Sequence, residues 1–415
     1  MRRKIIAAYF FKLARFYQDR VMSRQGTSSL KIRDYNEAVV ILCYRWAISF
    51  DPNLSEAHYQ LAVVLAKQRR WPEAVASFRQ AIENNYPYLF GAYFNLGRVL
   101  LKLEKFEESI PVFHRALESK PNEFWSYIYL GDALFETGKI SKAIQTYQTA
   151  LCKKISKTHS HFKLQLQNAE QSSTPNFIII GQAKCGTTSL YAYLTQHPQI
   201  LPALYKEIFF WNIRHKFDRG LDWYLAHFPL ICPEQNFITG EASTRYLDSI
   251  DAAQRLFQVF PKIKLIVLLR NPTDRALSEY YMRFRTRDED RDLETAIFSE
   301  LEALTQQRDV DLNNLYYLPP GIYIDNITKW MNIFPKNQFL ILKSEDLFRD
   351  PVTTVNQVFQ FLQVEQYQLK EYKIKNKGTY RPISKSMRSA LSDYFRPLNQ
   401  QLEEYLGMKF NWDSE

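Results

Sequence analysis

The amino-acid sequence predicts a multidomain protein, in which an all-α solenoid of repeats precedes a three-layer α/β domain with a mostly parallel central sheet. Its 415 residues exceed the roughly 100 to 200 that one domain usually contains. Small and aromatic residues recur about every 34 residues up to residue 154, and short apolar runs then alternate with helical patterns. These observations predict a helical segment over 1–33, a repeat domain over 34–154, a linker over 155–175 and an α/β domain over 176–415.

Pairs of a leucine and a small residue mark the repeats. They occur at Leu61-Ala62, Leu96-Gly97 and Leu130-Gly131, with spacings of 35 and 34 residues. Matching positions downstream hold small residues, aromatic residues and closing alanines: Ala74, Ser109 and Ala143; Phe78, Phe113 and Tyr147; Ala81, Ala116 and Ala150. The pattern resembles the tetratricopeptide repeat, a helix-turn-helix unit in which small residues let two helices approach while aromatic residues fill between them. Three repeats are clear, and residues 34–52 predict a degenerate or capping one.

An array of such repeats presents a concave surface, because each unit packs on its neighbours with a small rotation. We expect this surface to bind a protein or peptide partner, or a substrate. The alternative is a scaffold that only supports the neighbouring domain, since nothing in the repeats identifies a ligand.

The second half of the chain alternates strand and helix signals. Ser, Thr, Gln and His become frequent over 155–175, where the repeat pattern stops. Apolar runs then predict buried strands at 177–180, 264–269 and 339–342. Helical patterns begin at Thr188 and cover 252–260, 292–306, 321–334, 351–363 and 384–406. This alternation predicts a mostly parallel sheet that is covered by helices on both faces.

The loop after the first predicted strand, Gly181-Gln182-Ala183-Lys184-Cys185-Gly186-Thr187-Thr188-Ser189, is the most specific motif. A glycine-bounded turn that opens a helix aims several N–H groups and the positive helix end at one point, which suits a phosphate. In the Walker A loop of ATPases and kinases a lysine directly follows the second glycine, whereas Lys184 precedes Gly186 by two positions. This spacing argues against a standard ATPase or kinase. The candidate anion-binding residues are Lys184, Cys185, Gly186, Thr187, Thr188 and Ser189, and Cys185 is given no redox role.

The strand at 264–269 is followed by Arg270, where a Walker-type enzyme has an aspartate that helps to hold magnesium. A guanidinium repels a metal ion but binds a phosphate through two parallel hydrogen bonds. Asn271-Pro272 predicts the start of the next helix, and Ser278 lies two turns into it. We therefore expect a second phosphate site at Arg270 and Ser278.

Six stretches follow one another over nearly the whole second domain: FIIIGQAKCGTTSL (177–190), YKEIFFW (205–211), GEASTRYL (240–247), LIVLLRNPTDRALSEYY (265–281), GIYIDNITKWMNIFPKNQFLILKSEDL (321–347) and NKGTYRP (376–382). Together they resemble the sulfotransferases that use 3′-phosphoadenosine 5′-phosphosulfate (PAPS), particularly the branch with the heparan sulfate and other carbohydrate enzymes. The first and fourth stretches are the most specific.

The resemblance implies a role for each motif. In such enzymes the loop after the first strand holds the 5′-phosphosulfate of the donor, and the strand-end arginine with its serine holds the 3′-phosphate. The NKGTYRP stretch is similar to a loop that closes over the nucleotide, which implicates Lys377, Gly378, Thr379 and Tyr380. PAPS is thus implied as the donor and 3′-phosphoadenosine 5′-phosphate (PAP) as the product, with no metal ion.

The chemistry of sulfuryl transfer agrees with this resemblance. It needs an in-line arrangement, a base for the acceptor proton and positive charge near the leaving phosphate. Lys184 can supply that charge in place of a metal ion. Glu207, which matches the glutamate of the family's KE-x-x-FF stretch, is the candidate base, and burial beside Ile208 to Trp211 would strengthen it. Lys206 is a candidate for contact with an acidic acceptor or with the transferring group.

Composition disfavours several other classes of function. No apolar run reaches the roughly 18 residues of a spanning helix, and the apolar Ile5 to Phe11 is followed by Lys12 without a convincing signal-peptide cleavage site. Four scattered cysteines fit a reducing compartment. The seven histidines form no HExxH motif, and the basic residues behind the net charge of +10 show no nucleic-acid-binding motif. We expect a cytoplasmic, bacterial protein that binds neither metal nor nucleic acid.

The first hypothesis is an enzyme that transfers the sulfuryl group of PAPS to a hydroxyl or an amine of a glycan or similar acceptor. Three alternatives stay open at this point: a repeat-based adaptor whose α/β domain only senses nucleotide, a protein tyrosine sulfotransferase, and a P-loop kinase for a small molecule. The sequence identifies neither the acceptor nor the oligomeric state.

Overall fold

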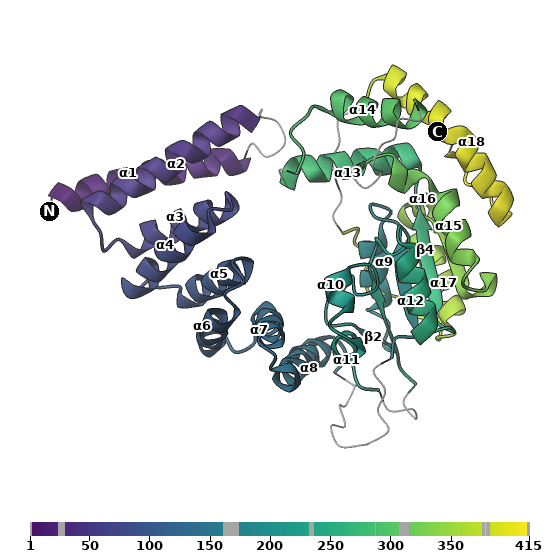
Figure 1. The fold of residues 1–415 in the computed structure, drawn as a ribbon, viewed down its shortest axis with the longest axis horizontal. Helices are drawn as coiled ribbons and strands as arrows, with labels where there is room; N and C mark the ends of the chain where they lie inside the picture. Colours follow the sequence, from purple (N-terminus) through teal and green to yellow (C-terminus); the bar gives the residue numbers. More distant parts are fainter. Residues whose placement is uncertain are drawn as a thin grey trace. The chain divides into compact units, whose positions relative to one another are not determined.

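The chain divides into two compact units, Met1–Lys154 and Ile155–Glu415, in the computed structural model shown in Figure 1. The structure describes residues 2–23, 30–160, 174–231, 236–286, 288–306, 315–375, 378 and 382–412. Each unit has its own core, so the two are described separately.

The first unit is a series of helices that pack on one another in chain order (Figure 1). They are α1 (Arg2–Ser23), α2 (Leu30–Phe50), α3 (Ser55–Lys67), α4 (Trp71–Glu83), α5 (Leu89–Lys102), α6 (Phe106–Ser119), α7 (Phe124–Glu136) and α8 (Ile140–Thr158). The pairs α3 with α4, α5 with α6, and α7 with α8 are the three repeats that the sequence predicts. Helix α8 extends to Thr158, which lies within the segment predicted as a linker.

The repeat glycines lie where two helices of one repeat touch. A Cβ atom added at Gly97 would lie 2.7 Å from the Phe113 ring, and one at Gly131 would lie 2.4 Å from the Tyr147 ring. Both rings are completely buried. The small residue therefore makes room for the aromatic side chain, as expected from the repeat pattern.

The second unit is built on five parallel strands: β1 (Phe177–Gly181), β2 (Ile200–Pro202), β3 (Ile238–Ala242), β4 (Lys264–Leu269) and β5 (Phe339–Lys343). Their order across the sheet is β2-β3-β1-β4-β5. The sequence predicts β1, β4 and β5 and misses the other two. Strand β2 has only three residues, and β3 includes Gly240 and Glu241, so neither reads as an apolar run.

Helices follow the strands and cover the sheet. They are α9 (Thr187–Leu194), α10 (Arg214–Phe217), α11 (Leu221–Leu225), α12 (Ile250–Val259), α13 (Pro272–Thr286), α14 (Leu293–Thr305), α15 (Tyr323–Met331), α16 (Ser344–Arg349), α17 (Pro351–Leu362) and α18 (Lys385–Leu406), with short 3-10 turns η2 (Pro319–Gly321) and η3 (Lys336–Gln338). Figure 1 shows α13, α14 and α18 gathered together at one end of this unit.

Both faces of the sheet are buried. Phe177 and Ile179 of β1 belong to a core cluster that also contains residues of α9 and α17. Ile178 and Ile180, which point to the opposite face because side chains alternate along a strand, are equally inaccessible. The predicted three-layer α/β architecture with a parallel sheet is confirmed.

Within the described ranges, no helix combines the length and the apolar character that a membrane crossing requires.

Candidate functional site

The sheet order brings the two predicted anion-binding motifs together. Strands β1 and β4 are parallel neighbours, with Gly181 paired to Val267, so the loops that follow them leave the same edge of the sheet. Lys184 follows β1 and Arg270 follows β4. The Arg270 guanidinium donates a hydrogen bond from Nη1 to the carbonyl oxygen of Lys184 at 3.4 Å. The two segments therefore touch at this edge.

The β1–α9 loop enters its helix through a left-handed glycine. Gly186 precedes α9 with a φ of 88°, a left-handed conformation that favours glycine, and an added Cβ would lie 3.0 Å from Phe348. Helix α9 begins at Thr187, and its first intrahelical bond runs from the Leu190 N–H to the Gly186 carbonyl. The N–H groups of Thr187, Thr188 and Ser189 thus lie in the first turn, where helix geometry provides no acceptor.

Gln182 braces this loop and was missed by the sequence analysis. Its side chain is completely buried. The oxygen Oε1 accepts the Ala183 N–H at 2.7 Å, while Nε2 donates to Asp248 Oδ1 at 2.6 Å and to the Pro320 carbonyl at 2.8 Å. These bonds tie the loop to two distant segments of the chain.

Cys185 differs from the other residues of the loop. Its side chain is fully buried in the core cluster, and the hydroxyl of Ser344 donates to its carbonyl at 2.6 Å. Burial raises the pKa of the Cys185 thiol to about 11, with nearby Arg275 and Arg270 opposing the rise. The side chain packs into the hydrophobic core beneath the helices, away from solvent. It therefore gives no support to the prediction that Cys185 contributes to ligand binding.

Lys184 reaches across to α13. Its backbone has a φ of 72°, and its ammonium group donates to the Met282 sulfur at 3.2 Å. Burial lowers the pKa of Lys184, whereas the negative charges of Glu279 and Glu207 raise it. The ammonium group therefore lies within electrostatic reach of the candidate base.

Ser278 and Ser189 lie on two helices of this edge. Ser278 is buried on α13, the helix that follows Arg270. The Ser189 hydroxyl on α9 accepts the Lys375 N–H at 2.9 Å, which holds the chain just before the predicted closing loop. Gly378 of that loop is half-buried, while Lys377, Thr379 and Tyr380 lie outside the described residues.

Glu207 enters the site from the loop that follows β2. Its N–H donates to the carbonyl of Ala242, at the end of β3, at 2.9 Å. Its side chain is 44% exposed and its carboxylate pairs with the Lys206 ammonium at 2.8 Å. The burial that would strengthen Glu207 as a base does not occur, because the adjacent Ile208 fills the core while the carboxylate projects to solvent. The carboxylate is consequently open to an incoming acceptor.

Two buried charges on α13 were also missed. Neither carboxylate oxygen of Glu279 has a hydrogen-bond partner among the described residues, and its nearest cation is the Arg245 guanidinium at 3.5 Å. Arg275, one turn earlier, donates to the carbonyl of Tyr317. In the sequence, charges four apart on a helix are typical of a solvated face, so only packing reveals that these are buried.

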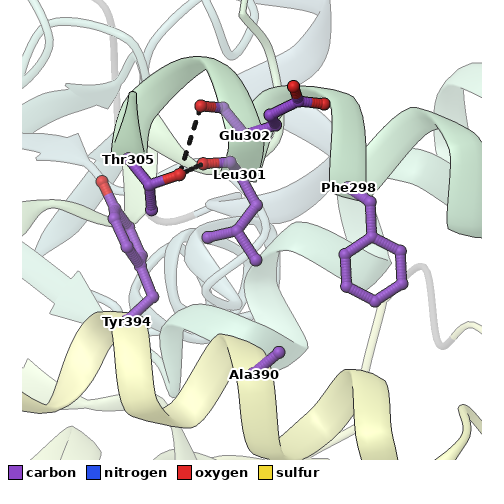
Figure 2. A pocket seen from close by; sticks show the side chains of 6 residues that line it. All are labelled: Phe298, Leu301, Glu302, Thr305, Ala390 and Tyr394. Carbon is purple, nitrogen blue, oxygen red and sulfur yellow. Dashed lines mark hydrogen bonds between the residues drawn. The ribbon is translucent and has the colours of Figure 1, made fainter. Parts of the chain in front are cut away.

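A separate hollow lies between α14 and α18 and contains none of the predicted site residues (Figure 2). It is lined by Phe298, Leu301, Glu302, Thr305, Ala390 and Tyr394. The Thr305 hydroxyl donates to the Leu301 and Glu302 carbonyls of its own helix, as the dashed lines in Figure 2 show. None of these six lining residues is a cation such as those of the sheet edge.

The comparisons with known proteins match both units. Residues 174–387 match the sulfotransferase domain family, while residues 55–87 and 94–157 match tetratricopeptide repeats. The sulfotransferase match spans just over half of the chain, which therefore belongs to the sulfotransferase family. Both resemblances drawn from the sequence are confirmed.

Several relatives share the second unit. The human protein named bifunctional heparan sulfate N-deacetylase/N-sulfotransferase 3 is 32% identical over 270 residues, which cover 56% of this chain and 30% of that protein. Heparan sulfate glucosamine 3-O-sulfotransferase 5 of mouse is 27% identical over 262 residues, covering 57% and 74%. The crystal structure of a sulfotransferase from Alicyclobacillus acidocaldarius is 28% identical with a TM-score of 0.50, covering 58% of this chain and 99% of that one. The chain thus spans less than a third of its human relative.

Across the described part of the chain, no three His, Cys, Asp or Glu side chains gather as they would around a metal ion.

Proposed function

We propose that the second unit transfers the sulfuryl group of PAPS to a hydroxyl or an amine of a carbohydrate acceptor. The contact between Arg270 and the Lys184 carbonyl is the observation that carries this proposal, because it brings the two proposed anion-binding segments together at one sheet edge. The names of the relatives, which refer to heparan sulfate, support a carbohydrate acceptor.

The donor set fits a nucleotide with phosphate groups at both ends. The first-turn N–H groups of α9 and the Lys184 ammonium suit the 5′-phosphosulfate. Arg270 and Ser278 suit the 3′-phosphate, since a guanidinium binds phosphate oxygens through paired bonds. Gly378, with Lys377, Thr379 and Tyr380, is proposed to close over the nucleotide, and the bond between the Lys375 N–H and Ser189 supports this placement.

In the proposed transfer, the acceptor oxygen or nitrogen attacks sulfur in line with the bond from sulfur to the 5′-phosphate oxygen. Glu207 takes the proton that the acceptor loses as its new bond to sulfur forms. Lys184 stabilises the negative charge that develops on the phosphate oxygen as the old bond breaks, which is the task of a metal ion in kinases. Lys206, paired with Glu207, is placed to hold the carboxylate or an acidic group of the acceptor.

The repeat unit is proposed to bind a protein or peptide partner, or to deliver a substrate. Aromatic rings of α5 and α7 support this role. The Phe94 and Tyr129 rings lie 5.8 Å apart, with the Arg98 guanidinium 5.7 and 5.8 Å from their centres. Trp125 beside them is 44% exposed. Exposed aromatic and arginine side chains are the residues that most often anchor a bound partner.

The test is incubation of the full chain with ³⁵S-labelled PAPS and N-desulfated heparan sulfate, with and without EDTA. The expected result is labelled glycan in both conditions and no label on glycan incubated without protein. Binding of PAP without transfer to this glycan or to tyrosine peptides would favour the nucleotide-sensing adaptor. Transfer to tyrosine peptides alone would favour protein tyrosine sulfation, and magnesium-dependent ATP hydrolysis would favour the kinase.

A further inference from the structure

Glu241 is a buried carboxylate next to the end of β3, and its side chain is completely inaccessible to solvent. It forms no salt bridge with any residue that the structure describes. Three hydroxyl groups donate to it instead: Tyr224 at 2.8 Å, Ser243 at 2.6 Å and Tyr246 at 3.1 Å. Burial raises the pKa of Glu241, and these hydrogen bonds oppose the rise. Burial of an ionisable group destabilises the folded state unless hydrogen bonds compensate it. The presence of Glu241 at this position therefore calls for a reason.

Two of the three hydroxyls continue to the Glu207 loop. The Ser243 oxygen accepts the Phe209 N–H at 3.2 Å, and the Tyr246 oxygen accepts the Phe210 N–H at 2.9 Å. A backbone N–H can only donate, so each hydroxyl oxygen accepts from the loop and keeps its own hydrogen available for Glu241. The two hydroxyls thus join the Glu207 loop to the buried carboxyl group.

The loop needs such support because its backbone is unusual. Glu207 has a φ of 67° and Phe209 a φ of 55°, in the left-handed region that residues with a Cβ rarely adopt. The Glu207 N–H is held by the Ala242 carbonyl, and Lys216 donates to the Ile208 carbonyl at 2.6 Å. Together with the Phe209 and Phe210 bonds, these contacts hold the turn that aims the Glu207 carboxylate outward.

We propose that Ser243 and Tyr246, whose hydroxyls are anchored on the buried Glu241, are positioning residues that fix the Glu207 loop. This inference rests on the proposed function, in which Glu207 is the base, because a base must be held close to the proton that it removes. Glu241 itself touches no substrate, since its carboxylate is sealed behind the loop.

Tyr224 provides a matched control within the same network. Its hydroxyl donates to Glu241 but is not among the groups that bind the loop N–H groups. Its ring stacks on Phe210 at 4.8 Å between centroids, and a phenylalanine at this position keeps that contact. Tyr224→Phe therefore removes a bond to Glu241 without removing an acceptor of the Phe209 or Phe210 N–H groups.

The first experiment compares Tyr246→Phe, Ser243→Ala and Tyr224→Phe in the full chain, with ³⁵S-labelled PAPS and N-desulfated heparan sulfate. A displacement of about 1 Å in a catalytic group can cost 10²-fold in rate. We expect kcat to fall about 10- to 100-fold in Tyr246→Phe and Ser243→Ala and less than threefold in Tyr224→Phe. The KM for PAPS and the Kd for PAP should change less than about twofold in all three, which a general loss of structure would not allow. In a Glu207→Gln background, Tyr246→Phe should cause no further loss.

The second experiment measures hydrogen exchange of the peptide over 205–211 by mass spectrometry. Exchange should be faster in Tyr246→Phe and Ser243→Ala than in Tyr224→Phe or the parent chain. Unchanged exchange in both variants would overturn the inference, as would an unchanged kcat or an equal loss in Tyr224→Phe. A parent chain that neither binds PAP nor transfers sulfate would instead overturn the proposed function, and the exchange data would still decide whether the Ser243 and Tyr246 hydroxyls hold the loop.

Discussion

In the repeat unit, the helix interfaces are filled by small residues and aromatic rings, such as Gly131 against Tyr147. In the second unit, the carboxyl edge of the sheet buries charged side chains, among them Glu241, Arg275 and Glu279. Burial of an apolar ring stabilises a fold directly, whereas burial of a charge opposes folding unless partners compensate it. Packing alone therefore accounts for the interior of the repeat unit. The buried charges of the second unit need another reason, and the proposed anion binding and sulfuryl transfer provide one.

Among changes that test this comparison, Glu207→Gln is expected to have the largest effect on the rate of transfer. A positioned general base contributes about 10²- to 10⁴-fold to a rate, so kcat for sulfuryl transfer should fall by that factor. The Kd for PAP, measured by calorimetry, should stay within about twofold because Glu207 is not assigned to donor binding. Glu294→Gln, which removes an exposed carboxylate on α14, is the control and should leave both quantities unchanged. Full activity in Glu207→Gln would remove it as the base.

The next effect is expected for Lys184→Ala and Arg270→Ala. A hydrogen bond to a charged group contributes about 1.5–3 kcal/mol, so each variant should weaken PAP binding about 10- to 150-fold. Lys262→Ala removes an exposed cation of the same charge just before β4, at the opposite end of the strand that Arg270 follows. That variant should bind PAP normally. Equal affinity in all three would contradict the assignment of the site to the carboxyl edge.

A smaller, pH-dependent effect follows from the environment of Lys184. Burial lowers the pKa of Lys184 from its ordinary 10.5, so the ammonium group loses its charge at a lower pH than an exposed lysine does. The affinity for PAP should therefore be highest near pH 7.5, where Lys184 is charged, and should fall several-fold as the pH rises toward 10. Lys184→Arg, whose guanidinium stays charged, should show a flat profile. The Kd measured at four pH values in both proteins tests this expectation, and parallel profiles would contradict it.

The smallest effect on the site is expected from a change in the repeat unit. Gly131→Ala places a Cβ atom 2.4 Å from the Tyr147 ring, and overpacking of this kind costs about 1–3 kcal/mol. Urea unfolding followed by circular dichroism should show the loss, while the Kd for PAP should not change. Gly91→Ala, whose Cβ would come no closer than 3.3 Å to the Tyr59 hydroxyl, is the control and should be neutral or stabilising. A weaker PAP affinity in Gly131→Ala would mean that the units are coupled.

Much of the fold could be predicted from the sequence because its signals are local. The repeat period, the apolar runs of β1, β4 and β5, and the helices that follow them all depend on residues close together in the chain. Strand β3 was missed because Gly240 and Glu241 interrupt its apolar pattern. Such a strand is recognisable only through its pairing with β1 and β2.

The candidate site divides in the same way. The Lys184 loop and Arg270 were readable from residue types and spacing, since a phosphate needs N–H groups and cations in a fixed local arrangement. The exposure of Glu207, the burial of Glu241 and Glu279 and the brace formed by Gln182 depend on segments far apart in the chain. They were settled only when parallel strands set the loops side by side, because burial and hydrogen-bond partners are properties of neighbours in space.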